Sequence, residues 1–452
     1  MENTKRTVTC GDLRKSNVGK NVVLNGWVSR TRDLGGLIFI RLRDRYGITQ
    51  VMVGDNASDE VKKIAASLKS EYCIAVEGVV NARSEKDINA DMATGEIEVE
   101  AKDIKIFTTS QELPFSIEEV RQKDGTLVIP NEDLRLKYRY LDLRRDPMQQ
   151  NIILRSQVTF ATREYLTSKG FLEIETPTFI KSTPEGARDY LVPSRVHPGK
   201  FYSLPQSPQL YKQLSMVAGF DRYMQIARCF RDEDLRADRQ PEFTQIDFEM
   251  SFVDMEDVLS IGEGYIKRVF KEAIDVDIEA PIPRLTYKEA MERYGSDKPD
   301  TRFEMELCNI SDVVADCGFA VFSGAVKNGG SVRGIKVDGG AKFTRKEIDS
   351  LTEFVKTYGA KGLAWARWTP EGVASSFGKF MSEDEMNAII ERVGAVKGDV
   401  VVIVADKDKV TLPSLGALRL EMAKKLDIIP QDKFNLLWIT EFPFFEYNEE
   451  TD

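Results

Sequence analysis

Arginines and carboxylates crowd a short stretch of the chain that starts at Phe230. It reads Phe-Arg-Asp-Glu-Asp-Leu-Arg-Ala-Asp-Arg-Gln-Pro-Glu and ends at Glu242. Five arginines between Arg222 and Arg239 stand among four acids. Arginine offers a planar, permanently charged fork for phosphate or carboxylate, and acids receive ammonium, amide or metal. The mixture suits a site that holds a polyanion and a cationic amine together. The alternative is a solvated hairpin tip whose charges compensate one another.

Apolar, alternating segments flank this charged stretch on both sides. Residues 223–230 precede it and residues 243–252 follow it, and both alternate with the period of a β-strand. The pattern predicts a strand, a charged loop and a second strand.

Histidine and cysteine chemistry are nearly excluded. His197 is the only histidine in 452 residues, so neither a histidine-based triad nor histidine-ligated zinc is expected. The five cysteines lie far apart without a Cys-x-x-Cys pair, which argues against disulfides and structural zinc. We therefore expect no protein-held metal centre. Catalysis would depend on carboxylates, arginines and lysines, together with a hard cation such as Mg²⁺.

Length and composition are those of an ordinary multidomain globular protein. A chain of 452 residues, 42% hydrophobic and 30% charged, has room for about two to four domains. Its apolar runs, such as 400–405, are far shorter than the roughly 18–20 residues of a membrane span. The polar N-terminus lacks the apolar core of a signal peptide, so we expect a cytoplasmic protein with no membrane association. A net charge of −10 argues against indiscriminate coating of nucleic acid, although a local basic patch is compatible with it.

Residues 1–108 have the element order of an OB-fold, a small β-barrel. Strands are expected at 21–31, 37–43, 48–53, 72–82 and 95–107, and a helix at 58–68. Such barrels commonly bind single-stranded nucleic acid on aromatic rings beside basic side chains. Five arginines and two aspartates surround Phe39 in the segment 30–45. Because Phe39 alternates with Ile38 and Ile40, the pattern does not decide whether its ring lies in the barrel core or outside.

The rest of the chain divides where its composition changes. Residues 109–137 are polar and aperiodic and contain two prolines, which indicates a hinge. A helix is expected through Leu154 and Tyr165 with its stop at Gly170, followed by an extended segment that ends at Pro177.

Further elements are expected downstream. A helix begins with Pro208 in its first turn, and others are expected at 255–274, 345–358 and 383–393. Two glycine-bearing turns and these last helices indicate an inserted α/β module, and 434–446 resembles a central strand of the preceding domain.

Three longer strings, at 183–197, 204–213 and 233–245, carry a family resemblance. The helix and strand that end at Pro177 resemble motif 1 of the class II aminoacyl-tRNA synthetases, and the hairpin at Phe230 resembles their motif 2. The strings resemble the bacterial-type aspartyl-tRNA synthetases in particular, over essentially the whole chain. The resemblance implies an anticodon-binding OB-fold β-barrel, a hinge, an α+β catalytic domain with an antiparallel sheet, and an inserted α/β domain. The corresponding ranges are 1–108, 109–137, 138–300 with 421–452, and 301–420.

The resemblance also implies a reaction and its residues. L-aspartate and ATP would form aspartyl-adenylate, and the aspartyl group would pass to the 3′-terminal adenosine of tRNA-Asp. Arg231 would be the catalytic residue, bridging the α-phosphate and the substrate carboxylate. The implied ATP contacts are Arg231, Asp232, Glu233 and Gln240. The implied aspartate contacts are Glu185 for the ammonium, then Gln209, Leu210, Tyr211, Lys212, Arg231, Gln245 and Asp247.

Two of these implications concern selectivity and assembly. A lysine at Lys212 suits the side-chain carboxylate of aspartate and disfavours neutral asparagine. Mg²⁺ would accompany ATP, and a homodimer is expected because motif 1 builds the class II subunit interface.

In the OB-fold, the resemblance assigns the anticodon contacts. Phe39 would stack on a base, Gln50 and Glu98 would read base edges, and Arg30 and Arg32 would lie beside them. Leu34 and Lys86 occupy positions where members that accept tRNA-Asn carry other residues. We therefore expect an enzyme restricted to tRNA-Asp.

One expected motif does not occur in the sequence. Motif 3, a glycine-rich strand and helix with an ATP-binding arginine, is not found before Asp452. We expect a C-terminally truncated sequence with an incomplete catalytic domain, inactive alone in ATP–pyrophosphate exchange. The alternatives are a non-catalytic tRNA-binding paralogue and an asparaginyl- or lysyl-specific relative. The inserted module and the Pro-Glu-Gly-Ala-Arg-Asp loop after Thr183 argue against such a relative.

Overall fold

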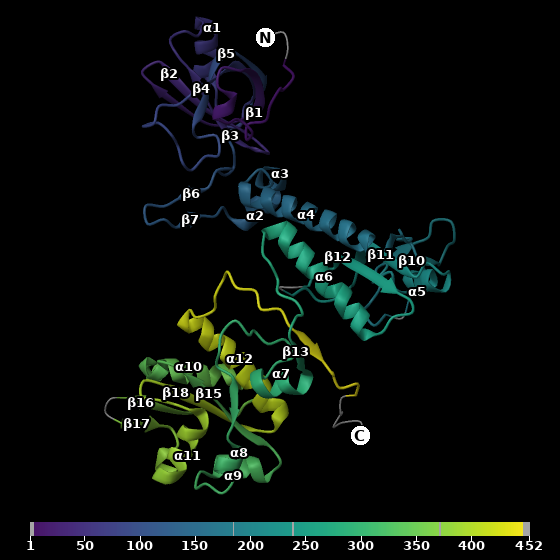
Figure 1. Ribbon diagram of the computed structural model, residues 1–452, viewed down its shortest axis with the longest axis vertical. Coiled ribbons are helices and arrows are strands. Elements are labelled where there is room, and N and C mark those ends of the chain that lie inside the picture. Colours follow the sequence, from purple (N-terminus) through teal and green to yellow (C-terminus); the bar gives the residue numbers. More distant parts are fainter. Residues whose placement is uncertain (1–3, 184, 237–238, 370–371, 446–452) are drawn as a thin grey trace. The chain divides into compact units, whose positions relative to one another are not determined.

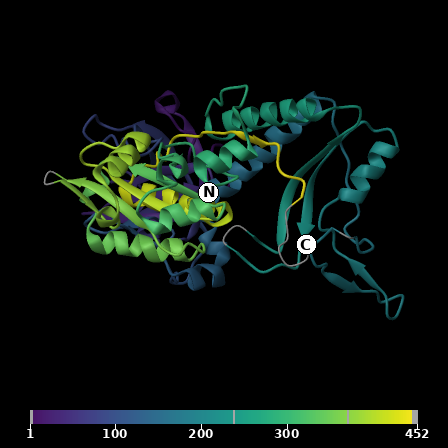
Figure 2. The ribbon, with the colours of Figure 1, turned by 90° about the horizontal axis from the view of Figure 1, so that it is seen from below.

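The computed structural model describes residues 4–183, 185–236, 239–369 and 372–445. The chain forms two compact units, residues 1–164 and 165–452. Figure 1 labels the elements, and Figure 2 shows the same ribbon from below. No helix among the described residues is long and apolar enough to cross a membrane.

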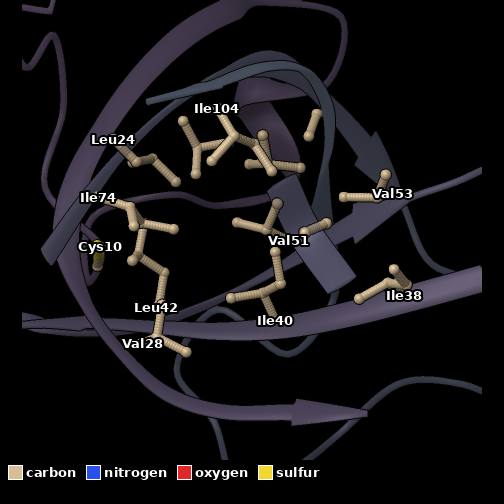
Figure 3. Close-up of a cluster of buried hydrophobic side chains, with 14 of the residues drawn as sticks. Cys10, Leu24, Val28, Ile38, Ile40, Leu42, Val51, Val53, Ile74 and Ile104 are labelled. Carbon is tan, nitrogen blue, oxygen red and sulfur yellow. The ribbon is translucent and has the colours of Figure 1, made fainter. Parts of the chain in front are cut away.

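The first unit opens with a closed five-stranded barrel of the OB-fold type. Its strands, in the order β1-β2-β3-β5-β4, are β1 (Asn21–Leu34), β2 (Leu37–Asp44), β3 (Gly47–Val53), β4 (Cys73–Ala82) and β5 (Ile97–Thr108), with α1 (Asp59–Ser67) between β3 and β4. The five expected strands and the helix are confirmed. Inward-facing residues such as Leu24, Leu42 and Val51 fill the barrel (Figure 3).

The alternation along β2 places Phe39 on the outside of the barrel. Ile38 and Ile40 are 5% and 0% exposed and belong to the core, whereas Phe39 between them is half-buried. Successive side chains of a strand point to opposite faces, so the Phe39 ring points away from the barrel interior. It lines an outer pocket that is described below.

The segment predicted as a hinge has secondary structure of its own. It contains β6 (Val120–Arg121), β7 (Leu127–Val128) and α2 (Glu132–Lys137), and α3 (Arg139–Asp142) follows it. Phe115 and Ile117 of this segment form a small apolar cluster with Leu141 of α3. Buried Glu71 accepts hydrogen bonds from Arg43 of β2 at 2.8 Å and from Arg144 at 2.7 Å. These bonds connect the barrel to the residues that follow α3.

A three-stranded sheet in the order β12-β11-β8 positions the charged hairpin. The elements around it are α4 (Asp146–Ser168), β8 (Leu172–Glu173), β9 (Leu191–Pro193), β10 (Phe201–Ser203), α5 (Gln209–Val217), β11 (Arg222–Phe230), β12 (Glu242–Met250) and α6 (Met255–Ile274). The strand–loop–strand prediction and the helix at 255–274 are confirmed. Pro208 is the N-cap of α5, one position before its first turn and not within it.

The inserted module is a five-stranded sheet with helices on both faces (Figures 1 and 2). Its order is β14-β15-β18-β16-β17 and its pairings are antiparallel. The strands are β14 (Leu307–Asn309), β15 (Ser331–Val337), β16 (Ala364–Thr369), β17 (Gly372–Ser375) and β18 (Val400–Asp406), and the helices are α8 (Ser311–Val314), α9 (Ala320–Lys327), α10 (Arg345–Lys356), α11 (Glu383–Val393) and α12 (Asp408–Leu426).

The expected central strand at 434–446 is wrong. Only β19 (Trp438–Thr440) is extended there, and it pairs in parallel with β13 (Arg284–Thr286), just before α7 (Tyr287–Tyr294), in a separate two-stranded sheet. Pro443 has no N–H to donate to a ladder, and Phe444 and Phe445 beside it are 90% and 85% exposed. The apolar run therefore predicted a buried strand. Among the described residues, however, most of its aromatic side chains have no neighbouring strand.

Candidate active site and nucleic-acid face

The β11–β12 hairpin has one apolar face and one polar face. Met224 and the even-numbered residues of β12 from Ile246 to Met250 pack on Leu166 and Ile261. The odd-numbered residues face the other way, because strand side chains alternate. Across the ladder Tyr223 pairs with Glu249, Gln225 with Asp247, Ala227 with Gln245 and Cys229 with Phe243. We call this odd-numbered side the polar face.

Helix α5 contributes a largely buried lysine to the polar face. Lys212 Nζ lies 2.8 Å from Asp247 Oδ1 and 3.3 Å from Glu249 Oε2, and the side chains of Lys212 and Asp247 are only 14% and 10% exposed. Burial lowers the pKa of Lys212, but the hydrogen bond and charge of Asp247, together with Glu249, raise it by more, so the net pKa is raised. Lys212 is therefore a permanent cation between two acids.

One carboxylate oxygen of this group has no partner. Asp247 Oδ2 is buried and accepts no hydrogen bond from the residues that the structure describes. A buried acceptor without a donor is costly, and a bound donor such as an ammonium group removes that cost.

The loop before β9 brings Glu185 into position. Glu185 Oε1 accepts from Thr183 Oγ1 at 3.1 Å, and Glu185 Oε2 accepts from Ser207 Oγ at 2.6 Å. Buried Gln206 binds both main-chain groups of Ala187 and donates to Asp189. These bonds hold the loop to the turn that precedes α5.

Asp189 carries a negative charge where the loop with Glu185 contacts the turn before α5. Burial raises its pKa, but hydrogen bonds from Ser182, Gln206 and Ser203 lower it by more, so it stays an anion that accepts these bonds. Position 184 lies outside the described residues.

Arg231 follows β11 directly and continues the odd-numbered series of the polar face. Its guanidinium carbon lies 5.0 Å from the centre of the Phe243 ring, and its backbone N–H donates to Pro241 O at 2.9 Å. No acid pairs with it among the described residues, whereas nearby Arg239 donates to Glu233 at 3.1 Å. The ring orients Arg231 and leaves its fork of donors available for an anion.

The hairpin loop is also tied to the loop that carries Glu185. Arg188 Nε donates to Asp232 O at 3.1 Å, and Asp232 N donates to Arg188 O at 3.0 Å. Gln240 is exposed. The two segments that would meet ATP and aspartate are thus held together by bonds to their main chains.

The structure brings five of the expected site residues together and leaves others at the margin. Lys212, Arg231, Gln245 and Asp247 lie on or against the polar face, and the charge of Glu185 helps to raise the pKa of Cys229 on that face. The remaining expected aspartate contacts are the exposed Gln209 and Leu210 and the half-buried Tyr211, all on α5. Asp232 and Glu233 lie on the hairpin loop with Gln240.

The sequence did not single out Ser207, Cys229 or Glu249. Ser207 stands within a string already quoted, and odd-numbered spacing on β11 and β12 is the signal that would have found the other two. Cys229 is fully buried, and burial raises the pKa of its thiol to about 11, with Asp247 and Glu185 adding to the rise and Arg231 opposing it.

The carboxylates do not form a metal cage. Among the described residues no group of three or more His, Cys, Asp or Glu side chains is placed to hold a metal ion.

A pocket of about 620 Å³ on the outer wall of the barrel collects the expected nucleic-acid contacts. Its lining includes Arg30, Arg32, Leu34, Phe39, Gln50 and Glu98. Gln50 Nε2 donates to Glu98 Oε2 at 3.0 Å. Lys86 is exposed between Ser84 and Asp87, both of which line the pocket.

Arg83 is a further member of this pocket that sequence reasoning missed. Its side chain is only 4% exposed and Nε lies 3.9 Å from Glu98 Oε2, while Nε and Nη2 have no hydrogen-bond partner within the described part of the chain. Burial lowers its pKa, against the charges of Glu98 and Asp87. A buried guanidinium in the same pocket as Phe39 thus offers unused donors.

Comparison with known proteins gives the same picture. The family model described as "tRNA synthetases class II (D, K and N)" matches residues 131–451, and one described as "OB-fold nucleic acid binding domain" matches residues 22–107. The aspartate–tRNA ligase of Ruminiclostridium cellulolyticum is 59% identical over 447 residues, which cover 99% of this chain and 74% of that protein. The aspartate–tRNA(Asp/Asn) ligase of Caldanaerobacter subterraneus is 57% identical over 446 residues, with the same coverage.

Solved structures agree on the fold. Asparaginyl-tRNA synthetase of Pyrococcus horikoshii, complexed with asparaginyl-adenylate, covers 92% of this chain and 96% of its own with a TM-score of 0.54. Its sequence identity of 19% is evidence for the fold alone.

The chain belongs to the class II tRNA synthetases, with an N-terminal OB-fold domain followed by the class II catalytic domain. Within that class it belongs to the aspartate–tRNA ligases, enzymes that join aspartate to tRNA and use ATP. The family resemblance is confirmed, and the comparisons do not favour the asparaginyl-, lysyl- or non-catalytic alternatives.

Proposed function

We propose that the polar face of the β11–β12 hairpin is where L-aspartate is activated with ATP, and that the outer pocket of the barrel selects tRNA-Asp. The observation that carries the first half is the largely buried Lys212 between Asp247 and Glu249, beside an Asp247 oxygen that has no hydrogen-bond partner among the described residues. A cation flanked by acids matches an amino acid with a carboxylate at one end and an ammonium group at the other.

Aspartate would be held by charge pairing at both ends. Lys212 receives the side-chain carboxylate, and Asp247 and Glu185 receive the ammonium. Gln209, Leu210 and Tyr211 form the first turn of α5, which sets the position of Lys212. A neutral asparagine side chain offers Lys212 no counter-charge, so it binds less well.

Arg231 would stabilise the charge that develops when the carboxylate of aspartate attacks the α-phosphate and pyrophosphate leaves. Its free fork binds both anions, and Gln245 orients the amino acid. No side chain need act as a strong base, because positioning and electrostatics supply the rate.

ATP would lie along the hairpin loop. Asp232, Glu233 and Gln240 are the proposed contacts beside Arg231. Mg²⁺ would bind chiefly through phosphate oxygens and water, as it does in sites that contribute few protein ligands.

The barrel would read the anticodon. Phe39 stacks on a base, Gln50 and Glu98 present polar groups to base edges, and Arg30 and Arg32 contact phosphates. Arg83 adds buried donors beside Glu98. Leu34 at the pocket wall and Lys86 beside it would restrict the enzyme to tRNA-Asp.

The domain limits, assembly and compartment are also proposals. We place the anticodon-binding domain at 1–108, the hinge at 109–137 and the catalytic domain from 138 to 300. The inserted domain, expected at 301–420, is extended to Leu426 because α12 runs through residue 420. We propose a cytoplasmic homodimer that uses motif 1 at its interface, and sedimentation as a monomer alone would contradict it.

Aspartate-dependent ATP–pyrophosphate exchange tests the proposal. The enzyme expressed from its complete reading frame should exchange with L-aspartate and much less with L-asparagine or L-lysine. It should then charge a tRNA-Asp transcript. Exchange that asparagine supports as well as aspartate would overturn the role given to Lys212.

A further inference from the structure

We infer that Cys229 is a positioning residue that fixes the side-chain amide of Gln245, so that the amide nitrogen and not its oxygen faces the acyl group of the substrate. The inference rests on the proposed function of the polar face and assigns a distinct role within it. Cys229 itself touches neither aspartate nor ATP.

The geometry places the two side chains in contact. Gln245 pairs with Ala227 across the ladder, so Cys229, two residues further along β11, is its diagonal neighbour on the same face. Cys229 Sγ lies 3.4 Å from Gln245 Oε1, closer than the 3.9 Å to Ala227 O. The thiol is fully buried, so solvent does not compete for this contact.

The thiol is a donor in this contact. Burial raises its pKa to about 11, so at neutral pH it keeps its proton. An amide oxygen accepts an S–H bond, whereas an amide nitrogen would offer two hydrogens to sulfur, which is a weak acceptor. The buried thiol therefore favours the amide oxygen on its side.

On the polar face, different side chains therefore bind the acyl oxygen and the ammonium group of the substrate. With Oε1 bound to Cys229, Gln245 Nε2 has no hydrogen-bond partner in the described part of the chain. Two N–H donors bind a carboxylate or carbonyl oxygen and cannot bind an ammonium group. Asp247 and Glu185 can only accept, so they receive the ammonium while Gln245 binds the acyl oxygen.

A pair of adenylate analogues separates these roles. Aspartyl-sulfamoyl adenosine keeps the acyl carbonyl, and aspartol adenylate carries a CH₂ group in its place. Cys229→Ala should weaken binding of the acyl analogue by roughly 3- to 10-fold, the range for one neutral hydrogen bond. Its affinity for the aspartol analogue should stay within about twofold, since the bond at stake is missing there.

Two further variants make the test specific. Cys229→Ser keeps a donor and should restore binding of the acyl analogue. Gln245→Glu keeps the shape of the side chain but replaces the N–H donor with an acceptor. It should weaken binding of the acyl analogue more than binding of the aspartol analogue. Cys10→Ala removes another fully buried cysteine, in the barrel core, and should change neither affinity.

Each outcome supports or overturns the inference. Equal losses for the two analogues, or wild-type affinities in Cys229→Ala, would overturn it. If Cys229→Ala fails to fold, the comparison of Gln245→Glu with Cys229→Ser takes its place, and equal losses for the two analogues in Gln245→Glu would again overturn it. Absence of aspartate-dependent exchange in the wild-type enzyme would instead overturn the proposed function.

Discussion

Lys212 Nζ lies 2.8 Å from Asp247 Oδ1, which connects helix α5 to strand β12 at the polar face. Glu249 adds a second acid at 3.3 Å, so acids outnumber the cation before a substrate arrives. The carboxylate of aspartate approaches the lysine while its ammonium meets the acids. The arrangement favours an amino acid that carries both groups.

Lys212→Met should raise the KM for aspartate by about 100-fold or more, with little change in the KM for ATP. Truncating one partner of a buried, hydrogen-bonded charge pair in a complex costs about 2–5 kcal/mol of binding free energy, because the other charge is left buried and unpaired. Exchange kinetics with each substrate varied in turn measure the effect. Lys271→Met is a matched control, since Lys271 also contacts two acids, Asp275 and Asp277, but is half exposed on α6. Similar KM values for aspartate in Lys212→Met and Lys271→Met would refute the assignment of Lys212 to the substrate carboxylate.

Arg231→Ala should lower the exchange rate by roughly 100- to 1,000-fold, the usual loss when a preorganised donor to developing charge is removed. Arg231→Lys keeps the charge but not the fork, so it should recover only part of the rate. Arg228 is the control: it lies on the opposite face of β11 and pairs with Glu242, and both side chains are more than half exposed. If Arg228→Ala were as slow as Arg231→Ala, general damage to the hairpin would be the better explanation.

Phe39→Ala should weaken tRNA-Asp binding by roughly 5- to 150-fold, as expected for one lost stacking contact of about 1–3 kcal/mol. Aspartate-dependent exchange should not change, because it requires no tRNA. Filter binding across a salt series measures the effect. Arg30→Ala should instead flatten the salt dependence, by about one unit of slope or slightly less. Weaker exchange in Phe39→Ala would contradict this separation.

Asp142→Asn should destabilise the segment after the barrel by about 2–4 kcal/mol at pH 7. The Asp142 side chain is fully buried and receives hydrogen bonds from Arg135, Arg139 and Arg145 at 2.9, 2.7 and 3.2 Å. The bond from Arg135 is the largest cause that lowers its pKa, against the opposing effect of burial.

The pH dependence of this effect has a definite sign. A carboxyl whose pKa is lower in the folded state contributes stability above its unfolded pKa of about 3.9, and loses it as pH falls through the folded pKa. The Tm difference between wild type and Asp142→Asn should therefore persist from pH 7 to about pH 4 and narrow below. Thermal unfolding at several pH values measures it. A difference that grows on acidification would disprove the argument.

Charging of tRNA-Asn should be much weaker than charging of tRNA-Asp. Relatives with more than 50% identity carry both names, so close similarity alone does not decide the range. Parallel aminoacylation of the two transcripts measures it. Comparable kcat/KM values for both tRNAs would show that Leu34 and Lys86 do not confer the restriction.

The sequence predicted the barrel strands well because the pattern that defines each strand lies in neighbouring residues. The alternation of β2 through Leu42 fixes which residues share a face, and turns separate the strands. The face of Phe39 required the closed barrel, since Ile38 and Ile40 alone do not reveal where the interior lies. The sequence did not indicate Arg83 either, because Arg83 comes close to Glu98 only through the pairing of β4 with β5.

The catalytic face was predicted through resemblance rather than through pattern. Lys212 and Asp247 are far apart in the chain, and only the packing of α5 on β12 brings them together. The contact of Cys229 with Gln245 depends on the register of the two strands, which neither strand reveals by itself. The error at 434–446 arose because an aromatic run suggests burial, whereas burial depends on which strands are available as neighbours.

The separation of odd and even residues on β11 and β12 limits how this hairpin can change over time. Inserting or deleting one residue within either strand would turn the side chains beyond the change to the opposite face, carrying Met224 of β11 away from the apolar cluster or Asp247 of β12 away from Lys212. Length changes should therefore be tolerated only between Asp234 and Arg239, because Asp232 is bonded to Arg188 and Asp232, Glu233 and Gln240 are the proposed ATP contacts. Among descendants of this sequence, the tip of the loop is free to vary in length, whereas the two strands can change only by substitution.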